Sequence, residues 1–104
     1  APGHTVVIPK MHTETLLHIA DEDMGLLWNS VKKVMTILTD TLRPDGFTVG
    51  INQGKAAGQV IDHVHVHIIP RWRDDGGKSI HAVVQNPSTE SPAIIAEKLR
   101  KSQK

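Results

Sequence analysis

One stretch of the chain, residues 60–70, most constrains its fold, because it alternates histidine with apolar residues. His63, His65 and His67 occupy every second position in the sequence VIDHVHVHIIP. Successive side chains of a strand point to opposite faces of a sheet, so an extended run places these three histidines on one face. The valine and isoleucine residues between them fall on the other face, where they suit a hydrophobic core. The pattern therefore predicts a strand, ended by Pro70, with a row of imidazoles opposite its core face.

Hydrophobic periodicity predicts most of the remaining elements. β-Branched residues predict strands over residues 4–10 and 47–51, and residues 13–19 are predicted as one helical turn or a loop. Residues 21–42 carry apolar side chains at spacings of three and four, which predicts one long helix. The buried stripe expected on that helix consists of Met24, Leu27, Trp28, Val31, Met35, Leu38 and Leu42.

Capping signals mark the ends of the helices. Asp21 is expected as the N-cap of the long helix, with two further acidic residues in its first turn. Residues 91–101 predict a C-terminal helix with Ser91 as N-cap and Pro92 at the first helical position. Residues 80–85 are predicted as a short strand or an extended tail. The expected fold class is α+β, with an antiparallel sheet, one long helix and a C-terminal helix in a single domain spanning residues 1–104.

Composition excludes several classes of function. The 104 residues suffice for one domain, and the absence of cysteine excludes disulfides, thiolate metal sites and cysteine nucleophiles. The chain has a net charge of +1, no basic block and only three aromatic residues. These features argue against a nucleic-acid-binding protein. No apolar run approaches the roughly 20 residues of a membrane span, and no signal-peptide pattern opens the chain. We therefore expect a cytoplasmic protein that binds neither nucleic acid nor membrane.

The row of histidines is open to three interpretations. Three buried imidazoles used as core filler would each need hydrogen-bond partners, which makes that use uncommon. A zinc site on His63 and His65 is an alternative, but neighbours on one strand face lie roughly 6.6 Å apart and three in a line converge poorly on a tetrahedral ion. Such a site would need a further ligand, for which the candidates are His4, His12, Glu14 and His81. The third interpretation is direct chemistry, because neutral imidazole serves as nucleophile and as general acid or base near neutral pH.

The motifs around the histidines resemble those of the histidine triad (HIT) family of nucleotide hydrolases and transferases. HVHVHII matches the family's His-x-His-x-His-x-x pattern, PGHTVVIPKMH resembles its upstream strand, and NQGKAAGQ resembles its approach to the triad. The resemblance covers roughly residues 2–72 in the family's order. It implies the HIT-like fold, in a chain that lacks the family's usual N-terminal segment and is similar to small prokaryotic members.

The resemblance also implies roles for individual residues. His65 corresponds to the nucleophile that attacks the α-phosphorus and forms a covalent nucleotidyl-histidine. His63 and His4 correspond to positions that orient this centre or relay protons, and His67 to the one that bonds the phosphate and leaving-group oxygens. The positions implied to contact the substrate are Asn52, Gly58 and Gln59. The scheme needs neither a metal nor another cofactor.

The activity implied is hydrolysis of the α-phosphate bond of purine nucleotide derivatives, either dinucleoside polyphosphates or nucleoside phosphoramidates. A histidine at position 67 points to a hydrolase, because hexose-phosphate nucleotidyltransferases of the superfamily carry glutamine there. Family members form homodimers through the long helix and an edge strand, here residues 47–51. The alternatives are a zinc-binding protein and a nucleotide-binding interaction module without turnover. His12 and His18 are expected to be ordinary surface residues.

Overall fold

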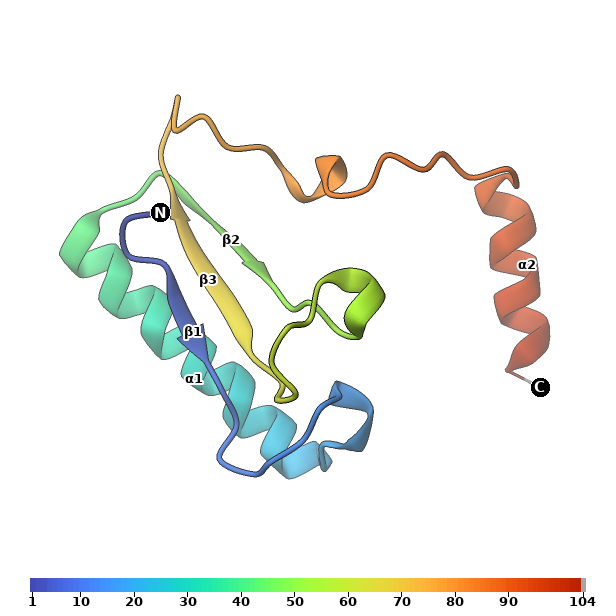
Figure 1. Ribbon diagram of the computed structural model, residues 1–104, viewed down its shortest axis with the longest axis horizontal. Coiled ribbons are helices and arrows are strands. Elements are labelled where there is room, and N and C mark those ends of the chain that lie inside the picture. Colours follow the sequence, from blue (N-terminus) through green and yellow to red (C-terminus); the bar gives the residue numbers. More distant parts are fainter. Residues whose placement is uncertain (104) are drawn as a thin grey trace.

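The structure, a computed structural model that describes residues 1–103, has the α+β architecture expected from the sequence. Three antiparallel strands form one sheet in the order β1-β3-β2, and the long helix packs across it (Figure 1). The elements are β1 (Thr5–Val7), α1 (Asp21–Leu42), β2 (Gly46–Gly50), β3 (Val66–Arg71) and α2 (Pro92–Ser102). Three short 3₁₀ turns lie at Leu16–His18, Lys55–Ala57 and Ile80–Ala82.

The central strand β3 begins later than predicted, at Val66 instead of residue 60. Residues 61–65 make different hydrogen bonds: the amide of His63 bonds the carbonyl of Ile61 at 2.8 Å, and the amide of Val64 bonds the carbonyl of Thr13 at 2.7 Å. The segment therefore turns and pairs with the loop after β1 instead of with a strand. The predicted first strand, residues 4–10, is likewise shortened to β1.

Pro70 lies inside β3 and does not end it, since the strand continues to Arg71. A central strand rarely accepts proline, which cannot donate a ladder hydrogen bond. Here β1 begins only at Thr5, opposite Ile68, so Pro70 lies beyond the β1 ladder and pairs with Phe47 of β2 alone.

The long helix α1 has the bounds predicted from periodicity. The predicted N-cap is wrong by one residue: Ala20 occupies that position, without a side-chain cap, and Asp21 is the first helical residue. Three carboxylates in the first turn compensate, because they face the positive end of the helix dipole. Arg43, in the left-handed conformation at φ 50°, ends the helix with its amide bonded to Thr39.

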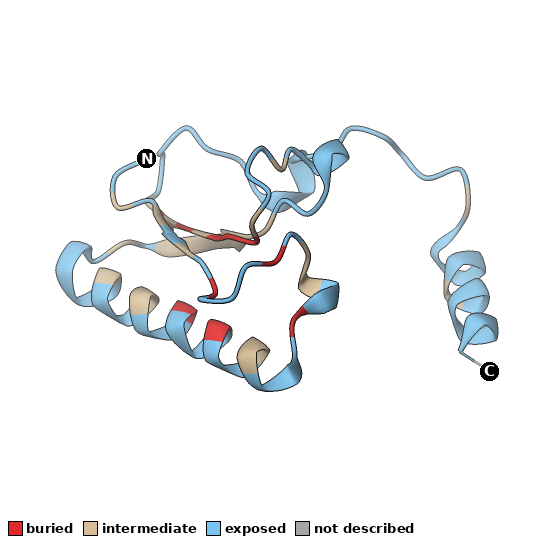
Figure 2. Cartoon of the chain, turned by 60° about the horizontal axis from the view of Figure 1, so that its bottom comes forward, coloured by how far each residue is buried: buried red, intermediate tan, exposed pale blue. Residues whose placement is uncertain are grey.

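The core forms between α1 and the valine and isoleucine face of β3, as the alternation predicted. Figure 2 shows the buried residues of α1 on the side that faces the sheet. The predicted stripe is too wide, however, because Trp28 and Leu42 are 41% and 39% exposed at its margins. The buried apolar residues are Ile19, Leu27, Val31, Val64, Val66 and Ile68.

Residues 79–103, which we call the C-terminal arm, begin beside β2, where Ser79, Ile80 and His81 border a groove with that strand, and then run away from the sheet and α1 (Figures 1 and 2). The capping prediction for α2 is confirmed: the Ser91 side chain accepts the amide of Ile94 at 3.3 Å, and Pro92 is the first helical residue. Residues 80–85 form the last 3₁₀ turn and an extended segment in place of a strand. Within residues 1–103, neither helix is long and apolar enough to cross a membrane.

Candidate active site

The structure brings two of the three predicted histidines into ring contact. The rings of His65 and His67 lie 4.8 Å apart, centroid to centroid, with an interplanar angle of 71°. His63 precedes the strand, in the turned segment, and its link to His65 runs through the backbone. The sequence predicted three imidazoles in a row on one strand face. The structure instead has the rings of His65 and His67 in contact, and His63 lies before the start of β3.

One hydrogen bond fixes the chemical state of His65. Its Nδ1 lies 2.8 Å from the backbone carbonyl oxygen of His63. A carbonyl oxygen only accepts, so Nδ1 carries the proton and donates it. In the neutral ring the lone pair then resides on Nε2, which is the nitrogen left to attack an electrophile. The side chain is 8% exposed, so packing also restricts its orientation.

His67 is coupled to a histidine far away in the sequence. The β1–β3 register pairs Thr5 with Ile68, and this places His4 Nε2 2.9 Å from His67 Nδ1. One of these two nitrogens donates and the other accepts, so the tautomers of the two rings are linked. Burial lowers the pKa of His67, and the neighbouring His65 and His4 lower it further. The His67 ring is therefore favoured in its neutral form near neutral pH.

His63 is held by the loop after β1. Its Nε2 donates to the carbonyl oxygen of Pro9 at 3.1 Å, and the ring of His12 meets the His63 ring edge-on at a centroid distance of 5.1 Å. The bond between Val64 and Thr13 draws this loop across the segment. His12 is exposed, as the sequence predicted, but its contact with the His63 ring was not predicted. Its sequence signal was only a histidine three residues after Pro9, and the fold of the loop supplies the contact.

The loop that precedes the triad closes on itself. Gly54 and Gly58 adopt φ values of 88° and 93°, which glycine allows without steric cost, and this permits tight turns there. The side chain of Gln59 accepts the amide of Gly54 at 2.8 Å and donates to the carbonyls of Glu14 and Ile61, both at 3.1 Å. The amide of Gly58 bonds the carbonyl of Lys55 at 2.9 Å. The polar groups expected to contact a substrate are thus used within the loop in this structure.

Asn52 is the exception among these residues. It lies just after β2, is exposed, and its side-chain amide makes no hydrogen bond within the part of the chain that the structure describes. A groove of about 510 Å³ opens nearby, and it borders both the His12 loop and the Gln59 loop. Its lining includes Thr13, Glu14, His18, Gln53 and Gly54.

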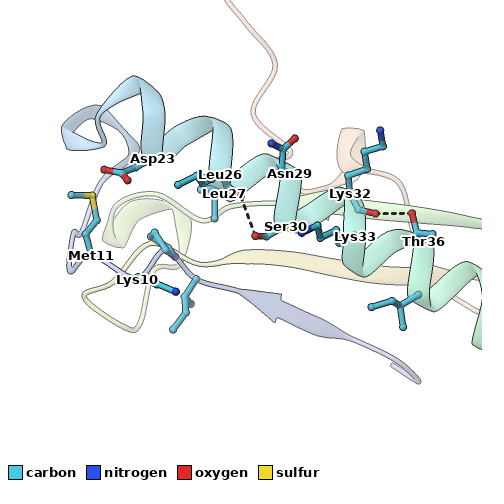
Figure 3. Close-up of a pocket in the computed structure, with 13 residues that line it drawn as sticks. Lys10, Met11, Asp23, Leu26, Leu27, Asn29, Ser30, Lys32, Lys33 and Thr36 are labelled. Atoms are coloured by element: carbon cyan, nitrogen blue, oxygen red, sulfur yellow. Dashed lines mark hydrogen bonds between the residues drawn. The ribbon is translucent and has the colours of Figure 1, made fainter.

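A larger groove, about 890 Å³, lies elsewhere, between the loop after β1 and α1 (Figure 3). Its apolar lining includes Ile8 and Leu26, and none of the three triad histidines borders it. The hydroxyls of Ser30 and Thr36 bond back to helix carbonyls at 3.0 Å, as the dashed lines show. This groove is therefore separate from the histidine cluster.

The zinc interpretation lacks a complete ligand set. Within residues 1–103, no group of three histidine, aspartate or glutamate side chains is arranged to hold a metal ion. His63 and His65, the pair considered for zinc, each donate one ring N–H to a backbone carbonyl, as metal-bound histidines also do, so the missing third ligand is what counts against zinc. The histidine cluster is better suited to proton transfer and nucleophilic attack than to metal binding.

Comparison with known proteins links this cluster to a family. The sequence profile of the HIT domain matches residues 1–74. A bis(5′-adenosyl)-triphosphatase of Dictyostelium discoideum is 38% identical over 74 residues, which is 71% of this chain and 50% of that protein. An AP-4-A phosphorylase of Mycobacterium tuberculosis is 36% identical over 100 residues, which is 95% of this chain and 50% of that protein.

The fold has solved counterparts as well. The crystal structure of a HIT-family protein from Bacillus subtilis superimposes with a TM-score of 0.78 at 32% identity, and the match covers 97% of this chain and 73% of that one. The chain spans about half the length of the curated relatives it matches.

Proposed function

The chain belongs to the HIT-domain family, and on that premise we propose that it hydrolyses the α-phosphate bond of purine nucleotide derivatives, with His65 as the nucleophile. The substrates proposed are dinucleoside polyphosphates or nucleoside phosphoramidates. The names of relatives that act on bis(5′-adenosyl) triphosphate and AP-4-A support the first class. The observation that carries the proposal is the 2.8 Å bond from His65 Nδ1 to the His63 carbonyl, because it leaves Nε2 unprotonated.

The proposed reaction proceeds in two displacements. In the first, Nε2 of His65 forms a bond to the α-phosphorus while the bond from phosphorus to the leaving group breaks. In the second, water attacks the phosphorus and gives a proton to the His67 ring that lost one in the first step, the P–N bond to His65 breaks, and a nucleoside monophosphate leaves. Covalent catalysis of this kind replaces one difficult displacement with two easier ones.

His67 and His4 supply the proton that the leaving group needs. If His4 Nε2 donates to His67 Nδ1, the neutral His67 ring keeps its own proton on Nε2. That N–H donates to the oxygens of the phosphate and of the leaving group, where negative charge develops. His63 acts through its carbonyl, which holds the His65 ring in the attacking tautomer.

The proposed substrate contacts come from the loop after β2. Asn52 is exposed just after β2, and Gly58 and Gln59 follow in the same loop, where Gln59 also lines the groove of about 510 Å³. Gln59 contacts a phosphate only if it exchanges one of its three loop hydrogen bonds for the substrate. No metal or cofactor takes part in this scheme, and a cytoplasmic location remains a prediction.

We also propose a homodimer that forms through α1 and the open edge of β2. β2 pairs with β3 on one side only, which leaves a row of backbone groups for another strand. An apolar groove of about 580 Å³ runs beside this edge and is lined by Trp28, Met35, Phe47 and Val49, among others. A second copy that packs there would cover both features.

The proposal is tested by turnover of diadenosine triphosphate and of a fluorogenic adenosine phosphoramidate. We expect hydrolysis by the unaltered chain and a loss of at least about 10³-fold in the His65→Ala variant, because removal of a nucleophile leaves only residual catalysis. His81→Ala, on the exposed C-terminal arm, is the matched control and retains activity. Binding of adenosine monophosphate without any turnover would favour the nucleotide-binding module instead.

A further inference from the structure

Thr13, in the loop after β1, is buried together with the proposed nucleophile. Within residues 1–103, the buried polar side chains are Thr13, which is 9% exposed, and His65, which is 8% exposed. Buried polar groups are hydrogen-bonded in folded proteins, so the partners of Thr13 show what it holds in place. The proposed reaction gives His65 a role and leaves Thr13 without one.

The hydroxyl of Thr13 shapes the loop in which it lies. It donates to the carbonyl of Thr15 at 3.0 Å and accepts the Thr15 amide at 3.4 Å. A threonine hydroxyl that bonds the backbone two residues further on closes a local turn. This turn restricts the direction of Thr13's own carbonyl, which accepts the amide of Val64 at 2.7 Å.

The Val64 amide and the His63 carbonyl belong to the same peptide group. That group is planar and trans, so its N–H and its C=O point in opposite directions. The N–H end bonds the Thr13 carbonyl at 2.7 Å, and the C=O end accepts the Nδ1 proton of His65 at 2.8 Å. A single peptide group therefore links Thr13 to the ring of the proposed nucleophile.

The two hydrogen bonds at the ends of this peptide group strengthen each other. The bond from Val64 to Thr13 polarises the group, which makes the His63 carbonyl a stronger acceptor. The same bond also fixes the orientation of the group. Val64 is 1% exposed, so its amide would be buried without a partner if the Thr13 carbonyl moved away.

The loop also holds this segment at two further points. The carbonyl of Pro9 accepts the ring Nε2 proton of His63 at 3.1 Å, and the carbonyl of Glu14 accepts the side-chain amide of Gln59 at 3.1 Å. Three backbone carbonyls of residues 9–14 therefore bond the segment that precedes β3. Thr13 supplies the one that bonds the peptide group next to His65.

We propose that Thr13 is a positioning residue for His65. Through the peptide group between His63 and Val64, it holds the His65 ring in the tautomer that has its proton on Nδ1 and its lone pair on Nε2. The consequence for catalysis rests on the proposed function. The tautomer itself is a property of the protein without substrate, so it is measured separately.

Nuclear magnetic resonance tests the proposal in the absence of substrate. Long-range ¹H–¹⁵N spectra at about pH 8.5, where imidazoles are neutral, distinguish protonated from unprotonated ring nitrogens. We expect a single His65 tautomer in the unaltered chain, with the proton on Nδ1. In Thr13→Val, which lacks the hydroxyl, we expect a mixture of both tautomers. Thr13→Ser keeps a hydroxyl and should restore the single tautomer.

Thr36→Val is the matched control for this experiment. Its hydroxyl also bonds a backbone carbonyl at 3.0 Å, but within α1, so the His65 spectrum should not change. A His65 spectrum that is the same in Thr13→Val and in the unaltered chain would overturn the proposal. Equal mixtures in Thr13→Val and Thr13→Ser would overturn it too, because the hydroxyl would then not be responsible.

The unaltered chain offers a second measurement that needs no variant. A scalar coupling across the hydrogen bond, between the Val64 amide nitrogen and the Thr13 carbonyl carbon, is expected in the folded protein. Its absence would contradict the proposal even if Thr13→Val did not fold.

Turnover of the fluorogenic adenosine phosphoramidate tests the consequence for catalysis. We expect kcat of Thr13→Val to fall by at least about fivefold with KM within about twofold, because only the tautomer with an unprotonated Nε2 attacks. Thr13→Ser should recover most of the loss. A rise in KM at constant kcat would contradict the positioning role. If the unaltered chain shows no turnover, the proposed hydrolysis fails, and the tautomer measurement still decides the role of Thr13.

Discussion

His67 lies between two other histidines, and this position sets its chemistry at the scale of single residues. Its ring contacts His65 on one side and shares a 2.9 Å hydrogen bond with His4 on the other. A proton on any one of these rings raises the cost of a proton on the next, because like charges at this distance repel. The pKa of His67 is lowered accordingly, so its neutral form is favoured.

The lowered pKa of His67 predicts a pH-dependent stability. Its folded pKa is below the ordinary value of about 6.5, so the unfolded chain binds more protons and acid favours unfolding. The stability that neutral His67 contributes is complete above that value and is lost as the pH falls toward the folded pKa. We expect the fall in Tm between about pH 7.5 and about pH 5 to be smaller in His67→Gln. His81→Gln, an exposed control, should keep the unaltered slope.

His12 is predicted to be a positioning residue for the site. Its ring packs against His63, whose carbonyl holds His65 in the attacking tautomer. In His12→Ala we expect kcat to fall about tenfold, which corresponds to about 1.4 kcal/mol of transition-state stabilisation, with KM little changed. His81→Ala, an exposed histidine of the C-terminal arm, is the control. A rise in KM at constant kcat would assign His12 to substrate binding instead.

At the scale of elements, local patterns predicted helices better than strands. The bounds of α1 and the cap of α2 were correct because periodicity and capping depend on residues within a few positions of each other. The start of β3 was wrong because Val64 bonds Thr13, a contact that no local pattern shows. Trp28 was wrongly included in the core because the width of a buried stripe depends on what covers the helix.

In the candidate site, too, local sequence patterns were predictive and contacts between distant segments were not. The strand alternation singled out the three histidines, and the family resemblance added His4, which the β1–β3 register brings to His67. His12 was missed because only the fold of the loop after β1 places it on His63. The loop bonds of Gln59 could not be read from its sequence either, since one of them reaches Glu14.

Two adjacent leucines of α1 test the packing of the core. Leu27 is 3% exposed, whereas Leu26 is 59% exposed on the neighbouring side of the helix. Leu27→Ala is expected to lower the free energy of unfolding by about 2–5 kcal/mol, because it leaves a cavity against the sheet. Leu26→Ala should change it by less than about 0.5 kcal/mol. Urea denaturation measures both, and equal losses would contradict the packing of α1.

At the scale of the whole molecule, one face of the sheet is covered by α1 and the β2 edge is open. The free edge of the sheet and the exposed Trp28 beside it are features of an association surface. The arm leaves the body on this same side (Figure 1). The proposed dimer accounts for both the open β2 edge and the groove along α1.

Trp28 is predicted to be a principal contact of that dimer. Tryptophan residues at the centre of an interface often contribute most of its binding energy. Trp28→Ala is expected to raise the dimer dissociation constant by at least about tenfold, with Leu26→Ala on the neighbouring side of α1 as the control. Sedimentation equilibrium measures both constants. Identical values for Trp28→Ala and the unaltered chain would place the interface elsewhere.

The nucleophilic role of His65 is the central claim, and intact-mass spectrometry after rapid quenching tests it most directly. The unaltered chain, mixed with a fluorogenic adenosine phosphoramidate, should gain the mass of one adenylyl group transiently, and the His65→Ala variant should gain none. Digestion should place the added mass on the peptide that contains His65. Turnover with no adduct at any quench time, or an adduct that persists in His65→Ala, would contradict the account.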